Sequence, residues 1–96
     1  MHPFDFTGIT SFVCEHPDSA FVFDPLNNNK FHWYGKELDK LGSYAVEQTN
    51  ILILTLEWNY GREQSYPVLS FEGTGDAMTA FVLKNHKTGE LIVFNR

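Results

Sequence analysis

The sequence contains a single cysteine, few basic residues and no long hydrophobic run. Because Cys14 is the only cysteine, no intrachain disulfide can form, which is typical of a reducing compartment. The longest apolar run, Ile51–Leu54, is far shorter than the roughly 20 residues that cross a bilayer as a helix. The first residues also lack the basic and apolar regions of a secretory signal. These absences predict a cytoplasmic protein with no membrane partner.

The basic residues are too few and too dispersed for a nucleic-acid-binding surface. Seven Lys and Arg residues oppose twelve Asp and Glu residues, which gives a formal net charge of −5. A phosphate backbone would be repelled by this charge, and no cluster of basic residues offers the positive stripe that counterion release requires. We therefore expect no nucleic-acid partner. A negative field favours a basic protein partner, or serves solubility alone.

No spacing of His, Cys or carboxylate residues matches a metal or catalytic motif. The segment Cys14–Asp18 holds a thiol, an imidazole and two carboxylates, but it lacks the paired spacings of zinc sites. A Cys14–His32–Asp24 triad can be drawn, although geometry and not residue inventory defines such a site. The segment Gly73–Asp76 lacks the phosphate-loop consensus and predicts a β-turn. The sequence thus indicates no metal site and no cofactor, and it favours a binding protein over an enzyme.

Aromatic residues are abundant in this chain. Nine Phe, four Tyr and two Trp residues make up 16% of the sequence, and 43% of all residues are hydrophobic. Because aromatic rings bury large areas at few positions, a chain of 96 residues can build a core without disulfides or metals. We expect one domain over residues 1–96.

Two-residue alternation of apolar side chains predicts mainly β-strands. Residues 20–23 and 30–34 are rich in aromatic and β-branched types, and the Pro- and Asn-rich segment between them predicts a hairpin. Residues 50–59 form the strongest predicted strand. A further strand is expected at 66–71, with Pro67 at its start or on a sheet edge. A final hairpin joins residues 78–83 to 91–94 through a turn at Gly89.

Two segments favour a helix over a strand. Residues 9–16 place Ile9, Phe12, Val13 and His16 at the spacing of an apolar helical stripe, which the next residue, a proline, would end. Residues 36–41 permit one or two further helical turns. The predicted fold is therefore α+β or mainly β, with about six antiparallel strands in a twisted or partly closed sheet and one short N-terminal helix.

The expected core consists of large apolar side chains on the predicted strands: Phe21, Phe23, Phe31 or Trp33, Leu52, Leu54, Leu56, Trp58, Phe71, Phe81 and Phe94. Ile51 and Ile53 lie on the opposite face of their strand from Leu54. Something apolar must cover them, either a second chain in a homodimer or the same sheet closed into a barrel.

The function that the sequence favours is non-enzymatic binding of a protein partner, as in a small inhibitor, antitoxin-like or immunity-like protein. Aromatic residues and arginine are the usual hot spots of interfaces, so the candidate binding residues are Tyr60, Arg62, His32, Trp33 and Tyr34. The alternative is a small oligomeric enzyme or small-molecule-binding barrel, with a pocket lined by His32, Trp33, Tyr34 and Trp58.

Overall fold

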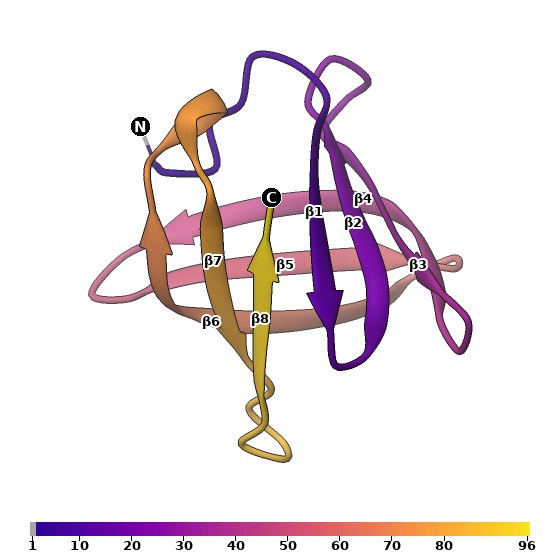
Figure 1. Cartoon of the computed structure of the whole chain (residues 1–96). Helices are drawn as coiled ribbons and strands as arrows, with labels where there is room; N and C mark the ends of the chain where they lie inside the picture. Colours follow the sequence, from indigo (N-terminus) through magenta and orange to yellow (C-terminus); the bar gives the residue numbers. More distant parts are fainter. Residues whose placement is uncertain (1) are drawn as a thin grey trace.

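The computed structural model describes residues 2–96, most of which lie in β-strands (Figure 1). In chain order the elements are β1 (Thr10–Glu15), β2 (Asp18–Asp24), β3 (Lys30–Gly35), β4 (Asp39–Gln48), β5 (Leu52–Trp58), β6 (Arg62–Glu72), the 3₁₀ turn η1 (Gly75–Ala77), β7 (Ala80–Lys84) and β8 (Leu91–Asn95). No helical segment within residues 2–96 has the length and apolarity that crossing a membrane requires.

The eight strands form a closed antiparallel barrel. Each strand pairs with its neighbour in the sequence, and β1 pairs with β8 to close the sheet. Strands β4, β5 and β6 cross the other strands at a steep angle (Figure 1). The two longest strands make the corners: residues 39–43 of β4 pair with β3 and residues 42–48 with β5, while β6 passes from β5 to β7. The corners of the barrel therefore lie within β4 and β6 and not in the loops between strands.

The predicted N-terminal helix is wrong, because residues 10–15 form strand β1. Alternation along β1 is complete, since Thr10, Phe12 and Cys14 are buried and the residues between them are exposed. Thr10 is the one polar residue among the three buried residues of β1. Its hydroxyl donates a hydrogen bond of 3.1 Å to the carbonyl oxygen of Gly8, which allows this polar side chain to lie on the inner face.

The count of six strands and the place of Pro67 also need correction. The barrel has eight strands, and residues 39–41, expected in helical turns, belong to β4. Pro67 lies within β6 and not at its start. It pairs with Ile53 at the last position shared with β5, and the next residue, Val68, is the first to pair with β7. A proline fits where the strand changes partner because it cannot donate a ladder hydrogen bond.

Both predicted hairpins are confirmed. Strands β2 and β3 pair from Ser19–Gly35 to Asp24–Lys30, and two asparagines in the loop between them have positive φ angles. Strands β7 and β8 pair along their whole length. Gly89 in their loop has a φ of 76°, a left-handed conformation that favours glycine.

Most of the predicted core is buried, with two exceptions. Phe71 is 44% exposed near the end of β6, and Trp58 is only partly buried. Both Phe31 and Trp33 are buried, because residues two apart on a strand share a face. The expected core list omitted further buried apolar residues, namely Phe4, Phe6, Phe12, Tyr44, Tyr66, Met78, Leu83 and Ile92.

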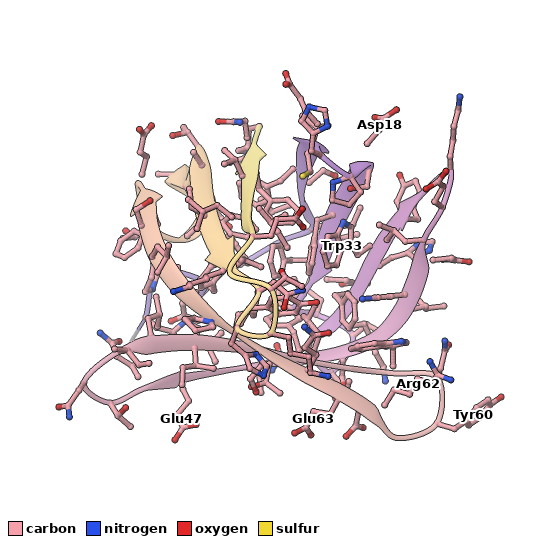
Figure 2. All side chains as sticks on the ribbon, turned by 90° about the horizontal axis from the view of Figure 1, so that it is seen from below. Asp18, Trp33, Glu47, Tyr60, Arg62 and Glu63 are labelled. Atoms are coloured by element: carbon pink, nitrogen blue, oxygen red, sulfur yellow. The ribbon has the colours of Figure 1, made fainter. Side chains whose placement is uncertain are left out.

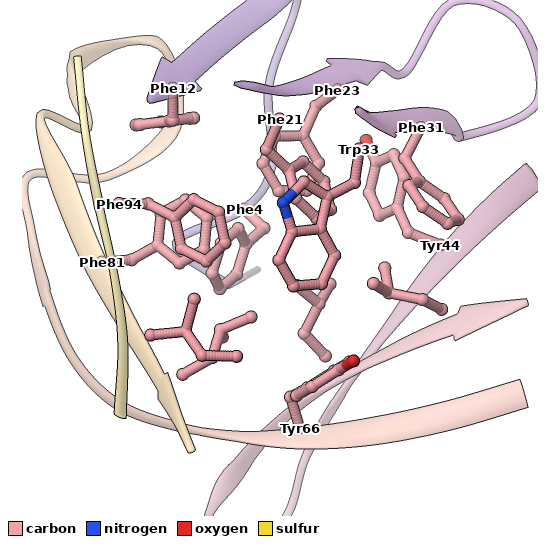
Figure 3. Close-up of a cluster of buried hydrophobic side chains, with 14 of the residues drawn as sticks. Phe4, Phe12, Phe21, Phe23, Phe31, Trp33, Tyr44, Tyr66, Phe81 and Phe94 are labelled. Atoms are coloured by element: carbon pink, nitrogen blue, oxygen red, sulfur yellow. The ribbon is translucent and has the colours of Figure 1, made fainter. Parts of the chain in front are cut away.

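The N-terminal segment closes one end of the barrel in place of the expected helix. Phe4 and Phe6 insert their rings against the core, where Phe4 lies 5.1 Å from Phe81 between ring centroids (Figure 3). The segment is tied to the β6–β7 loop by hydrogen bonds from the backbone and side chain of Thr7 to Asp76. These hydrogen bonds hold the pKa of the Asp76 carboxyl below its ordinary value.

Leu54→Ala should lower the free energy of unfolding by about 2–5 kcal/mol, because Leu54 is fully buried and its truncation leaves a cavity. The control is Ile53→Ala on the outer face of the same strand, which should cost less than about 1.5 kcal/mol. Urea denaturation of both variants tests the prediction. Equal losses at the two positions would contradict the assignment of Leu54 to the inner face of β5 and of Ile53 to its outer face.

The stability should fall at alkaline pH because of the buried tyrosines. Burial raises the pKa of Tyr66 to about 12, above the ordinary value of about 10. The neutral phenol therefore stabilises the fold below pH 10, and this contribution is lost as the pH rises towards 12. At pH 11 we expect a loss of about 1 kcal/mol from this residue, which Tyr66→Phe should remove. Denaturation curves at pH 8 and pH 11 measure the difference.

Candidate functional site

A groove on the outer wall of the barrel begins where three strands lie side by side. Val22 of β2, His32 of β3 and Leu41 of β4 are cross-strand neighbours that all face outward. Together with Asp24 and Lys30 they line a hollow of about 460 Å³. Leu41 is largely exposed, and together with Val22 it makes part of the wall of this hollow apolar.

A second hollow, of about 180 Å³, continues this groove towards the β5–β6 hairpin. Lys30 and Leu41 line both hollows, and Glu57 and Tyr60 line the second one. We call the continuous surface the β2–β5 groove, defined by Val22, Asp24, Lys30, His32, Leu41, Glu57 and Tyr60. Of the residues predicted from the sequence, His32 lines the first hollow and Tyr60 lines the second.

Tyr60 is fully exposed at the tip of the β5–β6 hairpin, where it projects away from the barrel beside Arg62 (Figure 2). Its φ of 61° lies in the left-handed region, as do those of Asn59 (47°) and Gly61 (101°). Asparagine and glycine adopt this conformation readily, whereas a tyrosine is strained there. The hairpin therefore holds an aromatic ring in solvent at a position that another residue type would occupy more stably.

His32 and Tyr34 lie on the outer face of β3, and their rings pack against each other. Their ring centroids are 4.5 Å apart with an interplanar angle of 33°. The Nε2 atom of His32 is 2.6 Å from the Oδ1 atom of Asp39 on the neighbouring strand. The imidazole is therefore held between a carboxylate and an aromatic ring at the edge of the groove.

Trp33 lies on the opposite side of β3 from His32 and Tyr34. Its ring is buried in the barrel, and its Nε1 atom donates a hydrogen bond of 2.9 Å to the hydroxyl of Ser19 (Figure 3). The structure therefore does not bring Trp33 together with the other candidate binding residues. The four side chains of the alternative pocket are also divided: Trp58 lies on the inner face of β5, where it is partly buried, although it also lines the second hollow.

Lys40 lies between the two tryptophans. Its Nζ atom is 4.4 Å from the ring centroid of Trp58 and 5.2 Å from that of Trp33, within the range of cation–π interactions. Burial lowers the pKa of the Lys40 ammonium. The sequence pattern did not indicate a role for Lys40, because residues 36–41 were expected in helical turns. A strand, in which alternate side chains point into the barrel, was not expected there.

Carboxylates outnumber cations around the β2–β5 groove. Asp24 and Glu57 line it and Asp39 holds His32, while Lys30 is the only lysine or arginine among the groove-defining residues. Glu57 also pairs directly with Glu63 across β5 and β6 (Figure 2 labels Glu63). Like charges at directly opposed positions repel each other. A cationic group bound along this side of the barrel would relieve that repulsion.

The Cys14–His32–Asp24 triad is not assembled. Cys14 is buried on the inner face of β1, whereas His32 lies on the outer wall. Burial raises the pKa of the Cys14 thiol, despite hydrogen bonds from the backbone N–H groups of His16 and Val93. In the part of the chain from residue 2 onwards, no three His, Cys, Asp or Glu residues cluster closely enough to hold a metal ion.

The fold and the site together define a small closed antiparallel β-barrel with a groove on its outer wall. Comparison of the chain with protein-family models, with curated proteins and with solved structures gives no match. The assignment of a function therefore depends on the geometry described above.

Cys14 should react slowly with thiol reagents in the folded protein. Because its thiol is buried and its pKa is raised, we expect modification at neutral pH at least about 100-fold slower than in urea-unfolded protein. Stopped-flow measurement with a chromogenic disulfide reagent gives both rates. A rate similar to that of the unfolded chain would mean that the thiol is accessible and activated.

Proposed function

We propose that this protein binds a protein partner without catalysis, through the β2–β5 groove and the exposed tip at Tyr60, as a small inhibitor, antitoxin-like or immunity-like protein does. The observation that carries the proposal is Tyr60 itself. Its ring is fully exposed and its backbone is strained, so Tyr60 does not contribute to the stability of the barrel. Tyrosine is among the residue types that contribute most to protein interfaces.

The shape of the surface supports a protein partner. The groove extends from β2 to the β5–β6 hairpin, and exposed apolar groups, Leu41 and the rings of Tyr34 and Tyr60, lie along or beside it. Apolar anchors surrounded by polar residues are typical of protein-binding patches. The candidate residues His32, Tyr34 and Tyr60 supply this surface, and Arg62 stands beside its tip (Figure 2).

The charge of the surface favours a basic partner. Asp24, Asp39 and Glu57 lie in or beside the groove, and the whole chain carries a formal charge of −5. A lysine or arginine side chain of the partner would be steered towards these carboxylates and would reduce the repulsion between Glu57 and Glu63.

A small-molecule site is the second candidate, and one observation favours it. The hollow beside His32, at about 460 Å³, falls within the usual range for sites of small ligands. In that case the imidazole of His32 and the ammonium of Lys30 would provide the polar contacts, and Tyr60 would play no part.

Tyr60→Asn tests the proposal, because asparagine adopts the left-handed conformation with less strain. We expect the free energy of unfolding to rise by about 0.5–1 kcal/mol while partner binding is lost. To detect the partner, a photo-crosslinking phenylalanine analogue, which keeps an aromatic ring at the tip, replaces Tyr60, or exposed Ile51 as a control, and the protein is crosslinked in extract of the source cells.

Crosslinked protein from position 60 alone, displaced by wild-type protein but not by the Tyr60→Asn variant, is the expected result. Equal products from both positions, or a loss of stability in Tyr60→Asn, would contradict the proposal. A small-molecule site predicts instead that the low-mass fraction of the extract raises the melting temperature of wild type and Tyr60→Asn alike.

A further inference from the structure

The wall opposite the β2–β5 groove carries a second exposed apolar surface. Val13 of β1, Leu69 of β6, and Leu91 and Val93 of β8 are 56%, 52%, 54% and 45% exposed. Large apolar side chains occur singly on most surfaces, but four of them together on adjacent strands are less usual. We call this surface, with the half-buried Val82 of β7, the β7–β8 face.

The register of the strands makes the β7–β8 face continuous. Val82 pairs directly with Val93, so the two valines lie side by side on the outer wall. Val13 pairs with Asn95, two residues along β8 from Val93. A bulge in β6 between Val68 and Ser70 leaves Leu69 outside the ladder, beside the same strands. In Figure 1, β7, β8 and β1 stand side by side.

The closure of the barrel is weakest beside this face. Strands β1 and β8 pair at only two positions, whereas every other neighbouring pair of strands has at least four. Where β1 and β8 separate, Glu15, His16, Leu91 and Val93 line a hollow of about 350 Å³. The apolar side chains of β8 thus border a hollow that can accept a side chain from another molecule.

Opposite charges stand at the two ends of the β7–β8 face. Lys84 pairs with Leu91 at one end, and Glu72 pairs with Ala80 at the other. Both side chains are exposed, and neither forms an ion pair with another residue in the described range 2–96. Between these ends the outward residues of β7 and β8 are uncharged.

We propose that two copies of this chain associate through the β7–β8 face about a two-fold axis. We place the two-fold axis in the plane of the interface, where it runs across β7 near Val82. This axis exchanges the two ends of the face, so Lys84 of each copy approaches Glu72 of the other. The surface is therefore complementary to itself in charge, as an isologous interface requires. An apolar centre also lets two molecules of net charge −5 approach where they repel each other least.

This arrangement leaves the β2–β5 groove free. In a closed ring of eight strands, β3 and β4 lie across the barrel from β7 and β8. Each dimer would present two grooves that face away from the interface. The self-association is consequently independent of the proposed partner binding, and either can fail without the other.

Sedimentation equilibrium of the full chain tests the proposal directly. We expect the mass to rise with concentration from 11.1 kDa towards twice that value. Val93→Lys should weaken association by at least roughly tenfold, because it places a charge at the apolar centre. The matched control, Ile51→Lys at a similarly exposed apolar residue away from this face, should leave association unchanged. A constant mass of 11.1 kDa at all concentrations would overturn the proposal.

Charge reversal tests the two-fold arrangement. Lys84→Glu and Glu72→Lys should each weaken association, because each places like charges opposite one another. The double variant should restore it, since every pair is then reversed. Both residues are exposed, so circular dichroism should show that all variants fold. Failure of the double variant to recover, or the same effect from Ile51→Lys, would overturn the arrangement.

Discussion

The rest of the structure depends on the packing of phenylalanine rings inside a closed barrel. Phe81 and Phe94 stack with centroids 4.6 Å apart, and Phe21 and Phe23 lie within 6.4 Å of Phe81. These contacts join β2, β7 and β8, which are distant in the sequence (Figure 3). The rings hold the two sides of the barrel together because each buries a large area and contacts several others.

A filled interior leaves the outer wall as the surface that is open to contacts with other molecules. Most buried positions of the barrel are occupied by large apolar side chains, and the N-terminal segment adds Phe4 and Phe6 at one end. Two groups of exposed apolar side chains lie on this outer wall: Tyr34 and Leu41 on β3 and β4, and Val13, Leu69, Leu91 and Val93 on the β7–β8 face. A closed sheet offers few free strand edges, so side chains and hairpin tips must provide contact surfaces.

The candidate site could be predicted only in part from the sequence. Tyr60 was proposed because a turn pattern surrounds it, and His32 and Tyr34 were proposed because they lie in an aromatic strand. Alternation places Trp33 on the opposite face of that strand from His32 and Tyr34, but it does not show which face is outside, so all three residues were kept as candidates. Leu41 was missed because its segment was expected to be helical. The pairing of β4 with β3 is what places the Leu41 side chain on the outer wall, and this pairing cannot be read from the sequence.

The sequence by itself determined the β-rich composition, both hairpins and the acidic charge, because these depend on alternation, turn residues and composition. The tertiary structure alone decided that the sheet closes, that residues 10–15 form a strand, and which aromatic rings lie outside. The pairing of Cys14 with Phe94 joins opposite ends of the chain and is absent from any local pattern. In residues 9–16, barrel closure and burial of Phe12 and Cys14 outweigh a weak helical spacing, since short-range preferences are small beside the energy of core burial.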